Sequence, residues 1–72
     1  MNENASSIEL VGVVKQAYTD GKPRFRREYQ GLSKDFDKLP VSDDMAPGSC
    51  CLFLDNGTYA QYHAGTKTWY LI

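Results

Sequence analysis

Two turn signals near the end of the chain constrain its fold more than any other feature. Asn56-Gly57 accepts the positive φ that a two-residue hairpin turn requires, and it separates an apolar run from a segment rich in β-formers. Residues 64–67 include a glycine and can form a four-residue loop. The segments on either side of these turns are short and contain no proline. Residues 48–72 therefore predict three antiparallel strands joined in a meander.

The pairing implied by these turns gives the meander one strongly apolar face. A turn at Asn56-Gly57 places Phe53 opposite Ala60, and the following loop places Tyr62 opposite Trp69. Because side chains alternate across a strand, one set of residues shares this face, and we predict that it is the core side. Its members are Cys51, Phe53, Ala60, Tyr62, Trp69 and Leu71.

The opposite face of the meander is more apolar than a solvated surface usually is. It carries Cys50, Leu52, Leu54, Tyr59, Gln61, His63, Tyr70 and Ile72. The N-terminal part of the chain can cover some of it through Ile8, Leu10 and Val14, but that part is too short and too charged to cover all of it. We therefore expect a partner or a second copy of the chain on this face. The predicted interface residues are Leu52, Leu54, Tyr59, Tyr70 and Ile72.

The N-terminal half predicts a second hairpin. Residues 8–18 are rich in β-branched side chains, and Gly12 among them indicates a bulge. Asp20-Gly21 is a second turn signal, and residues 22–30 return as the partner strand. This turn places Val14 opposite Arg27 and Gly12 opposite Tyr29, although the weak sidedness of these strands leaves their register poorly specified.

The segment between the two β regions predicts a single helical turn. Ser33 is suited to cap it, Phe36 and Leu39 are placed to pack inward, and Pro40 ends it. Residues 41–49 are turn material.

These elements together predict an all-β domain of about five short antiparallel strands. An N-terminal hairpin and a C-terminal three-stranded meander would pack as a small sandwich or an open barrel. Residues 1–7 are small and polar, so we expect a flexible arm there, followed by a single domain over residues 8–72. A core of this size rarely supplies more than about 3–5 kcal/mol, so we expect the chain to form a homo-oligomer or to dock on something larger.

Charge and cysteine usage exclude several classes of function. The net charge is −1, and no general field attracts nucleic acid or an anionic membrane. Cys50 and Cys51 are adjacent and point to opposite faces of a strand, so they do not bond to each other and they suit a reducing compartment.

One histidine and two diverging cysteines do not make a metal site, and we expect no cofactor. The longest apolar run is too short to cross a bilayer, and the N-terminal residues lack the features of a signal peptide.

One strand offers an alternative function as a nucleic-acid-binding module. Arg24, Phe25, Arg26, Arg27 and Tyr29 interleave positive charge with aromatic rings, a pattern that can bind single strands in a small β-barrel. The simpler interpretation is a charged strand that stays soluble and resists edge-to-edge pairing. Acidic residues between positions 35 and 44 offset the positive charge, which favours the simpler interpretation.

A third possibility is a thiol enzyme. The predicted pairing places Cys50 opposite His63, and a Cys–His pair is the start of a nucleophilic site. The sequence places no third orienting group and suggests no oxyanion donor. We therefore expect a small strand thiol beside an imidazole at the edge of the sheet, and no enzymatic activity.

The residues from position 43 onward also carry a resemblance. In order they are Pro47, Gly48-Ser49, the apolar residues 50–54, Asp55-Asn56-Gly57-Thr58-Tyr59 and Lys67-Thr68-Trp69. This succession resembles the end of small virion proteins of tailed bacteriophages, which are usually described as head fibre or minor structural proteins.

The resemblance implies a non-enzymatic virion protein, made in the cytoplasm of a bacterial host. Such a protein contacts other virion proteins on the capsid or the tail as a decoration, fibre or attachment subunit. The chain has no heptad repeat and no Gly-x-y stalk, which favours a compact subunit over a fibre.

Overall fold

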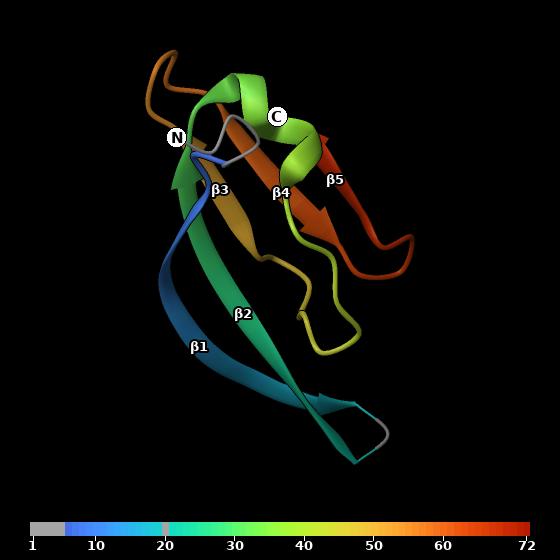
Figure 1. Ribbon diagram of the computed structural model, residues 1–72. Helices are drawn as coiled ribbons and strands as arrows, with labels where there is room; N and C mark the ends of the chain where they lie inside the picture. Colours follow the sequence, from blue (N-terminus) through green and yellow to red (C-terminus); the bar gives the residue numbers. More distant parts are fainter. Residues whose placement is uncertain (1–5, 20) are drawn as a thin grey trace.

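The computed structural model of the chain forms one five-stranded sheet (Figure 1). The elements are β1 (Glu9–Thr19), β2 (Lys22–Gly31), the 3-10 helix η1 (Ser33–Lys38), β3 (Cys50–Phe53), β4 (Tyr59–His63) and β5 (Thr68–Leu71). The strands lie in the order β1-β2-β3-β4-β5. The structure describes residues 6–19 and 21–72, without the side chains of residues 16–19.

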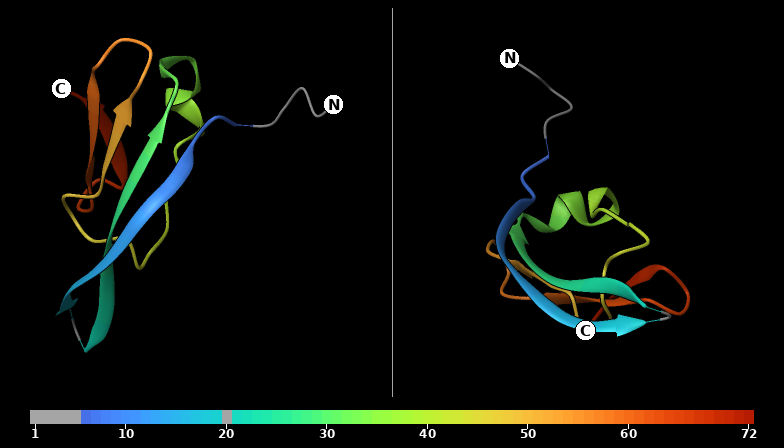
Figure 2. Two further views of the ribbon diagram at one scale, coloured as in Figure 1. Left: turned by 90° about the vertical axis from the view of Figure 1, so that its left-hand side faces the viewer. Right: turned by 90° about the horizontal axis from the view of Figure 1, so that it is seen from below.

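The predicted all-β class is confirmed, and the sheet is open and mostly antiparallel. One pair of strands differs from our expectation, because β2 and β3 run parallel, with Tyr29 opposite Cys51 and Gly31 opposite Phe53. A parallel return requires a crossover connection. Residues 32–49, which we call the crossover, contain η1 and lie on one side of the sheet (Figure 2). The core therefore forms between the sheet and this crossover.

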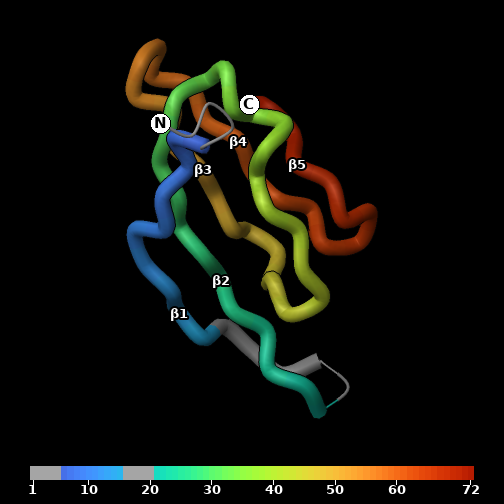
Figure 3. Tube along the Cα trace, viewed as in Figure 1, coloured from blue at the N-terminus to red at the C-terminus, as the bar shows by residue number. Residues whose placement is uncertain are grey.

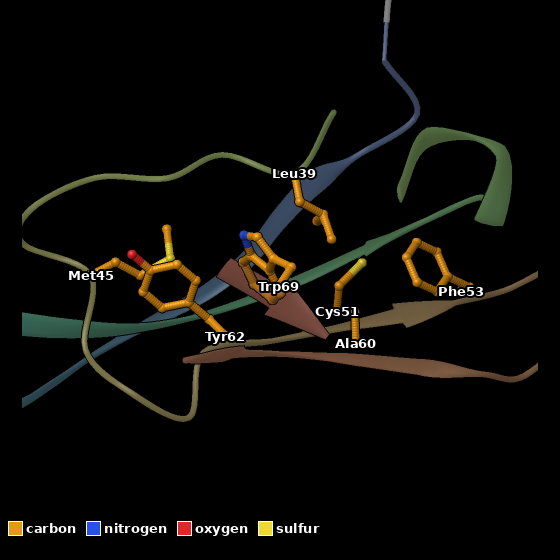
Figure 4. Packing of buried hydrophobic residues seen from close by; sticks show 7 residues of the cluster. All are labelled: Leu39, Met45, Cys51, Phe53, Ala60, Tyr62 and Trp69. Carbon is orange, nitrogen blue, oxygen red and sulfur yellow. The ribbon is translucent and has the colours of Figure 1, made fainter. Parts of the chain in front are cut away.

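The crossover buries the predicted core side of the meander. Five of the six predicted core residues are buried, and Figure 4 shows them packed with Leu39 and Met45 of the crossover. Trp69 lies near the centre of this cluster, with its ring centroid 5.3 Å from that of Tyr62 and its indole N–H donating to the Pro40 carbonyl at 2.8 Å. Leu71 is the exception, with 58% of its surface exposed, because it lies at the end of the edge strand and outside the buried cluster.

The turn between β3 and β4 is longer than predicted. Cys51 pairs with Ala60, and the Phe53 N–H donates to the Thr58 carbonyl at 2.8 Å, so four residues make the turn instead of two. Gly57 supplies the positive φ that we expected, at 71°, and its N–H donates to the Phe53 carbonyl at 2.8 Å. The register is therefore shifted by two residues. Because side chains alternate with a period of two, an even shift leaves every side chain on its predicted face. The predicted core side of the meander is therefore the buried side.

The other two turns follow the sequence signals. His63 pairs with Thr68 across the predicted four-residue loop, in which Lys67 has a φ of 52°. Thr19 pairs with Lys22, and Gly21 has a φ of 76°, as the second hairpin signal predicts. Asp20 lies outside the described residues.

The register of the first hairpin differs from the predicted one. The bulge indicated by Gly12 is present, as a register shift between Leu10 and Gly12. A second shift between Lys15 and Ala17 moves the pairing by one residue, so Val14 lies opposite Arg26 and Gly12 opposite Glu28. The hairpin extends the same sheet, and the start of β2 projects beyond the three strands of the meander (Figure 3). It therefore does not fold over the second face of the meander, as we had expected through Ile8, Leu10 and Val14.

A buried carboxylate joins the start of the described chain to η1. Asp35 is 1% exposed and accepts hydrogen bonds from the Ser7 amide at 2.9 Å and from the Ser7 hydroxyl at 2.7 Å. The Lys38 ammonium lies 3.2 Å from the same carboxylate. Ser7 in turn accepts a hydrogen bond from the Leu32 amide at 2.9 Å. Ser7 belongs to the segment that we expected to be a flexible arm, and residues 1–5 of that segment lie outside the described residues.

The predicted helical turn is present as η1, but its cap is not the predicted one. Leu32 occupies the N-cap position and makes no side-chain capping bond. Ser33 instead donates its amide at 3.0 Å and its hydroxyl at 2.7 Å to the carboxylate of Asp55, in the β3–β4 turn. Phe36 packs edge-on against Phe53 as expected, with the ring centroids 6.2 Å apart. Within the described part of the chain, no helix is long and apolar enough to cross a membrane.

Trp69 is expected to be essential for folding. We predict that Trp69→Ala lowers the free energy of unfolding by about 3–5 kcal/mol, because it removes a buried aromatic ring from a small core. Tyr70→Ala is the matched control, since Tyr70 is the next aromatic residue on β5 and is exposed. Urea unfolding of both variants measures the difference. A Trp69→Ala variant as stable as Tyr70→Ala would contradict this core.

Asp35 is expected to make stability depend on pH in the acid range. The hydroxyl and amide of Ser7, helped by Lys38, hold the pKa of the Asp35 carboxyl well below its usual value. The stabilisation by the ionised group is complete above its unfolded pKa of about 3.9 and is lost as the pH falls below it.

The stability gap between the parent and Asp35→Asn should therefore stay constant between pH 7 and about 5, and shrink as the pH falls through about 4 and below. Urea unfolding at a series of pH values measures this gap. Asp37→Asn, at an exposed position of the same helix, is the control. A difference in unfolding free energy between the parent and Asp35→Asn that is constant with pH would show that ionisation of the carboxylate does not stabilise the fold.

Candidate functional site

The face of the sheet opposite the crossover carries exposed apolar side chains whose position the core does not explain. In the part of the chain that the structure describes, no segment packs over it, and we call it the open face. The burial of β4 alternates strictly along the strand, with Ala60 and Tyr62 buried and Tyr59, Gln61 and His63 exposed. One side of the sheet is therefore core, and the other side is available for contact.

The open face brings together four of the five predicted interface residues. Leu52 pairs with Tyr59, and the Ile72 amide donates to the Tyr59 carbonyl at 2.9 Å, so these three form a row across β3, β4 and β5. Tyr70 lies in the next row, opposite Gln61. Tyr59 is 49% exposed, Tyr70 51% and Ile72 76%, whereas Leu52 is half-buried. Leu54 is exposed but lies beyond the end of β3, in the turn.

Two valines of β1 extend the open face, and neither was among the predicted interface residues. Val11 lines a shallow hollow with Leu52 and Tyr59, and Val14 lies on the same side of the sheet, opposite Arg26. The β-branched run in the sequence indicates that both valines lie in a strand. The face of the sheet on which each valine lies depends on two bulges, and only the bulge near Gly12 could be predicted.

The residues of the predicted nucleic-acid strand are separated by the fold. Arg27 lies on the crossover side and forms a paired contact with Asp44, at 3.1 and 3.2 Å. Arg26 lies on the open face and pairs with Glu28 at 3.6 Å, and Arg24 donates to the Asp43 carbonyl. The hydrogen bond from Arg27 lowers the pKa of the Asp44 carboxyl to about 2, so this pair is ionised at neutral pH.

The aromatic residues of that strand are also engaged. Tyr29 packs edge-on against Trp69 with ring centroids 6.1 Å apart, and burial raises the pKa of its hydroxyl. The Phe25 amide donates to the Asp44 carbonyl at 2.7 Å, and the Arg27 guanidinium lies 5.7 Å from the centre of the Phe25 ring. The structure therefore does not gather Arg24, Phe25, Arg26, Arg27 and Tyr29 into one basic and aromatic surface.

The predicted pairing of Cys50 with His63 is wrong. Cys50 lies opposite Gln61, because the longer turn shifts the register by two residues. The His63 Nδ1 accepts a hydrogen bond from the Thr66 amide at 3.3 Å and lies 2.9 Å from the Thr66 hydroxyl. The imidazole therefore stabilises the β4–β5 loop.

The two cysteines occupy different environments. Both thiols are free, with Cys50 partly exposed and Cys51 buried under the crossover. Burial raises the pKa of the Cys51 thiol to about 11, so almost none of it is thiolate at neutral pH. Among residues 6–19 and 21–72, no group of three or more histidine, cysteine, aspartate or glutamate side chains could hold a metal ion.

Comparisons of the chain with protein-family models, with curated proteins and with solved structures found no match. The surfaces of the protein and the chemistry of its side chains are therefore the basis for a function.

The two thiols are expected to react at very different rates. At pH 8, a thiol reagent should modify Cys50 in the folded protein and leave Cys51 unmodified, because Cys51 is inaccessible and largely protonated. Mass spectrometry of the labelled protein measures the sites. Cys50→Ser should abolish labelling of the native state, and addition of urea should restore one site. Rapid native labelling of Cys51 would contradict its burial.

Proposed function

We propose that the chain is a non-enzymatic structural subunit that docks on another protein through its open face. The observation that carries this proposal is the row Leu52–Tyr59–Ile72, with Tyr70 beside it, on a face that no described segment covers. An exposed apolar patch on a small soluble domain is typical of an interaction site. Tyrosine is enriched in such sites because it combines a large apolar area with a polar end.

The open face is suited to binding because hydrogen bonds between strands hold its backbone in place. Tyr59 stands on the central part of the meander, paired to Leu52 on one side and bonded to Ile72 on the other. Because the backbone of these strands is already hydrogen-bonded, binding does not require a loop to become ordered. Burial of each large apolar side chain contributes about 1.5–3 kcal/mol. A few such residues are therefore enough for a specific contact.

The resemblance of residues 43–72 supports a place in a bacteriophage particle. On that basis, the partner is another virion protein of the capsid or the tail. The chain would act as a decoration or attachment subunit. The apolar open face and the paired arginines favour this function over nucleic-acid binding. Arg24, Arg26 and Arg27 each already have an acidic or carbonyl partner, which a phosphate would have to displace.

The proposed docking predicts that Tyr59→Glu weakens binding to virions by about tenfold or more, because it places a charge at the centre of the contact. The measurement is co-sedimentation of the purified chain with particles of the encoding phage that lack it. Val41→Glu is the matched control, since Val41 is also about half exposed but lies on the crossover side.

Equal binding by Tyr59→Glu and the parent would exclude the open face as the docking surface. A series of salt concentrations distinguishes docking on a protein from the alternative function, nucleic-acid binding. Nucleic-acid affinity falls steeply as salt is raised, because counterions are released on binding, whereas contact through an apolar face changes little. Binding that is lost in moderate salt and that resists Tyr59→Glu would favour the nucleic-acid function.

A further inference from the structure

The two edges of the sheet are protected to very different degrees. β1 carries two register shifts, and Glu9 and Lys15 add charge to it. Bulges and charges are the devices by which proteins keep an edge strand from pairing with another chain. β5 has the sequence TWYL and pairs in regular register with β4, and it contains no charge, proline or bulge. β5 is therefore open to pairing at its outer side.

The outer side of β5 presents backbone groups in a defined pattern. The Ile72 amide donates to the Tyr59 carbonyl on β4. In an antiparallel pair, hydrogen bonds to the neighbour alternate along the strand, so Tyr70 and Thr68 also bond toward β4. The amides and carbonyls of Trp69 and Leu71 consequently point away from the sheet. Among the described strands, β4 is the only one that pairs with β5.

The side chains around this edge are also apolar and exposed. Leu71 was predicted to be a core residue and shares a face with Trp69, yet it lies outside the buried cluster and is more than half exposed. Tyr70 and Ile72 are exposed on the other face. Unpaired backbone and exposed apolar side chains on both faces therefore occur at the same edge.

We propose that β5 pairs antiparallel with β5 of a second copy of the chain, which joins the two sheets into one. A two-fold axis at Tyr70 places Trp69 opposite Leu71 of the partner subunit, and Leu71 opposite the partner subunit's Trp69. The outward groups of these residues then form about four hydrogen bonds. Each exposed Leu71 gains an indole neighbour on its own face, and the two Tyr70 rings meet across the axis on the open face.

A second copy fits this edge better than an unrelated strand does. When a second copy is rotated about a two-fold axis, its outward amides meet the outward carbonyls of the first copy, and the reverse. Two-fold rotation is also the commonest symmetry of homodimers. The edge carries no charge that would repel its copy. Leu71 and Trp69 each lie one position from the axis at Tyr70, so the exposed Leu71 of one copy meets the apolar Trp69 of the partner subunit. This surface is the edge of the sheet, so the inference goes beyond docking through the open face.

The test compares two substitutions at one position, by sedimentation equilibrium of the full chain over a dilution series. The parent should form a dimer of twice its 8.1 kDa mass. Leu71→Pro removes an outward amide without affecting a bond to β4, and it should weaken the dimer by about tenfold or more. Leu71→Val keeps the amide and should dimerise almost as the parent does.

Tyr59→Glu changes the open face away from the edge, and it should also dimerise almost as the parent does. Dimerisation without a virion partner is thus measured separately from docking. A dimer that survives Leu71→Pro and is lost in Tyr59→Glu would overturn the edge contact and move self-association to the open face. A parent that stays monomeric at every concentration would also overturn it.

Hydrogen exchange provides a measurement that does not depend on a variant folding. In the parent, the Leu71 and Trp69 amides should exchange more slowly as the protein concentration rises, while the Tyr70 amide is protected throughout by its bond to β4. Exchange of Leu71 at a rate independent of concentration would overturn the proposal. Protection of the Leu71 and Trp69 amides only after virion proteins are added would show that the β5 edge binds one of those proteins and not a second copy of the chain.

Discussion

The rest of the structure depends on the parallel pairing of β2 with β3. Because parallel neighbours cannot be joined by a tight turn, residues 32–49 must cross the sheet, and they bury one of its faces. Ser49 fixes the end of this crossover, since its hydroxyl donates to the Ala46 carbonyl at 2.9 Å and accepts from the Arg27 amide at 3.0 Å. A single crossover can cover only one face of the sheet. The topology therefore leaves the open face uncovered by the described residues and accessible to a partner.

Polar contacts at the two ends of the crossover hold it in place. Asp35 and Ser7 join the N-terminal residues to η1, and Asp55 accepts both hydrogen bonds from Ser33. At the other end, Arg27 pairs with Asp44. In the sequence, Arg27 belonged to the nucleic-acid alternative, and Asp35 and Asp44 were among the acidic residues that offset its charge. In the fold, these polar contacts attach the crossover to the sheet and to the N-terminal residues.

Local patterns predicted the strands, the turns at Gly21 and Gly57 and the buried face, because these depend on neighbours along the chain. The pairing of Cys50 with His63 was mistaken because one turn has four residues instead of two, and both lengths suit Asn-Gly. The sidedness of Val11 and Val14 depended on two bulges. The parallel pairing of β2 with β3 could not be predicted, since no short-range signal marks which strand a crossover returns to. Four of the five predicted interface residues share one face of the sheet, because the even register shift preserved their sides.

The crossover also has a consequence for how the chain reaches its native state. The hairpins β1–β2, β3–β4 and β4–β5 close short loops and can form independently, within microseconds. The contact of Glu28 with Cys50 joins residues far apart in the chain and brings loop-closure entropy that local pairing does not. We expect the docking of β2 on β3 to be the slow step of folding. Until then both faces of the meander are exposed, and association of chains competes with completion of the fold.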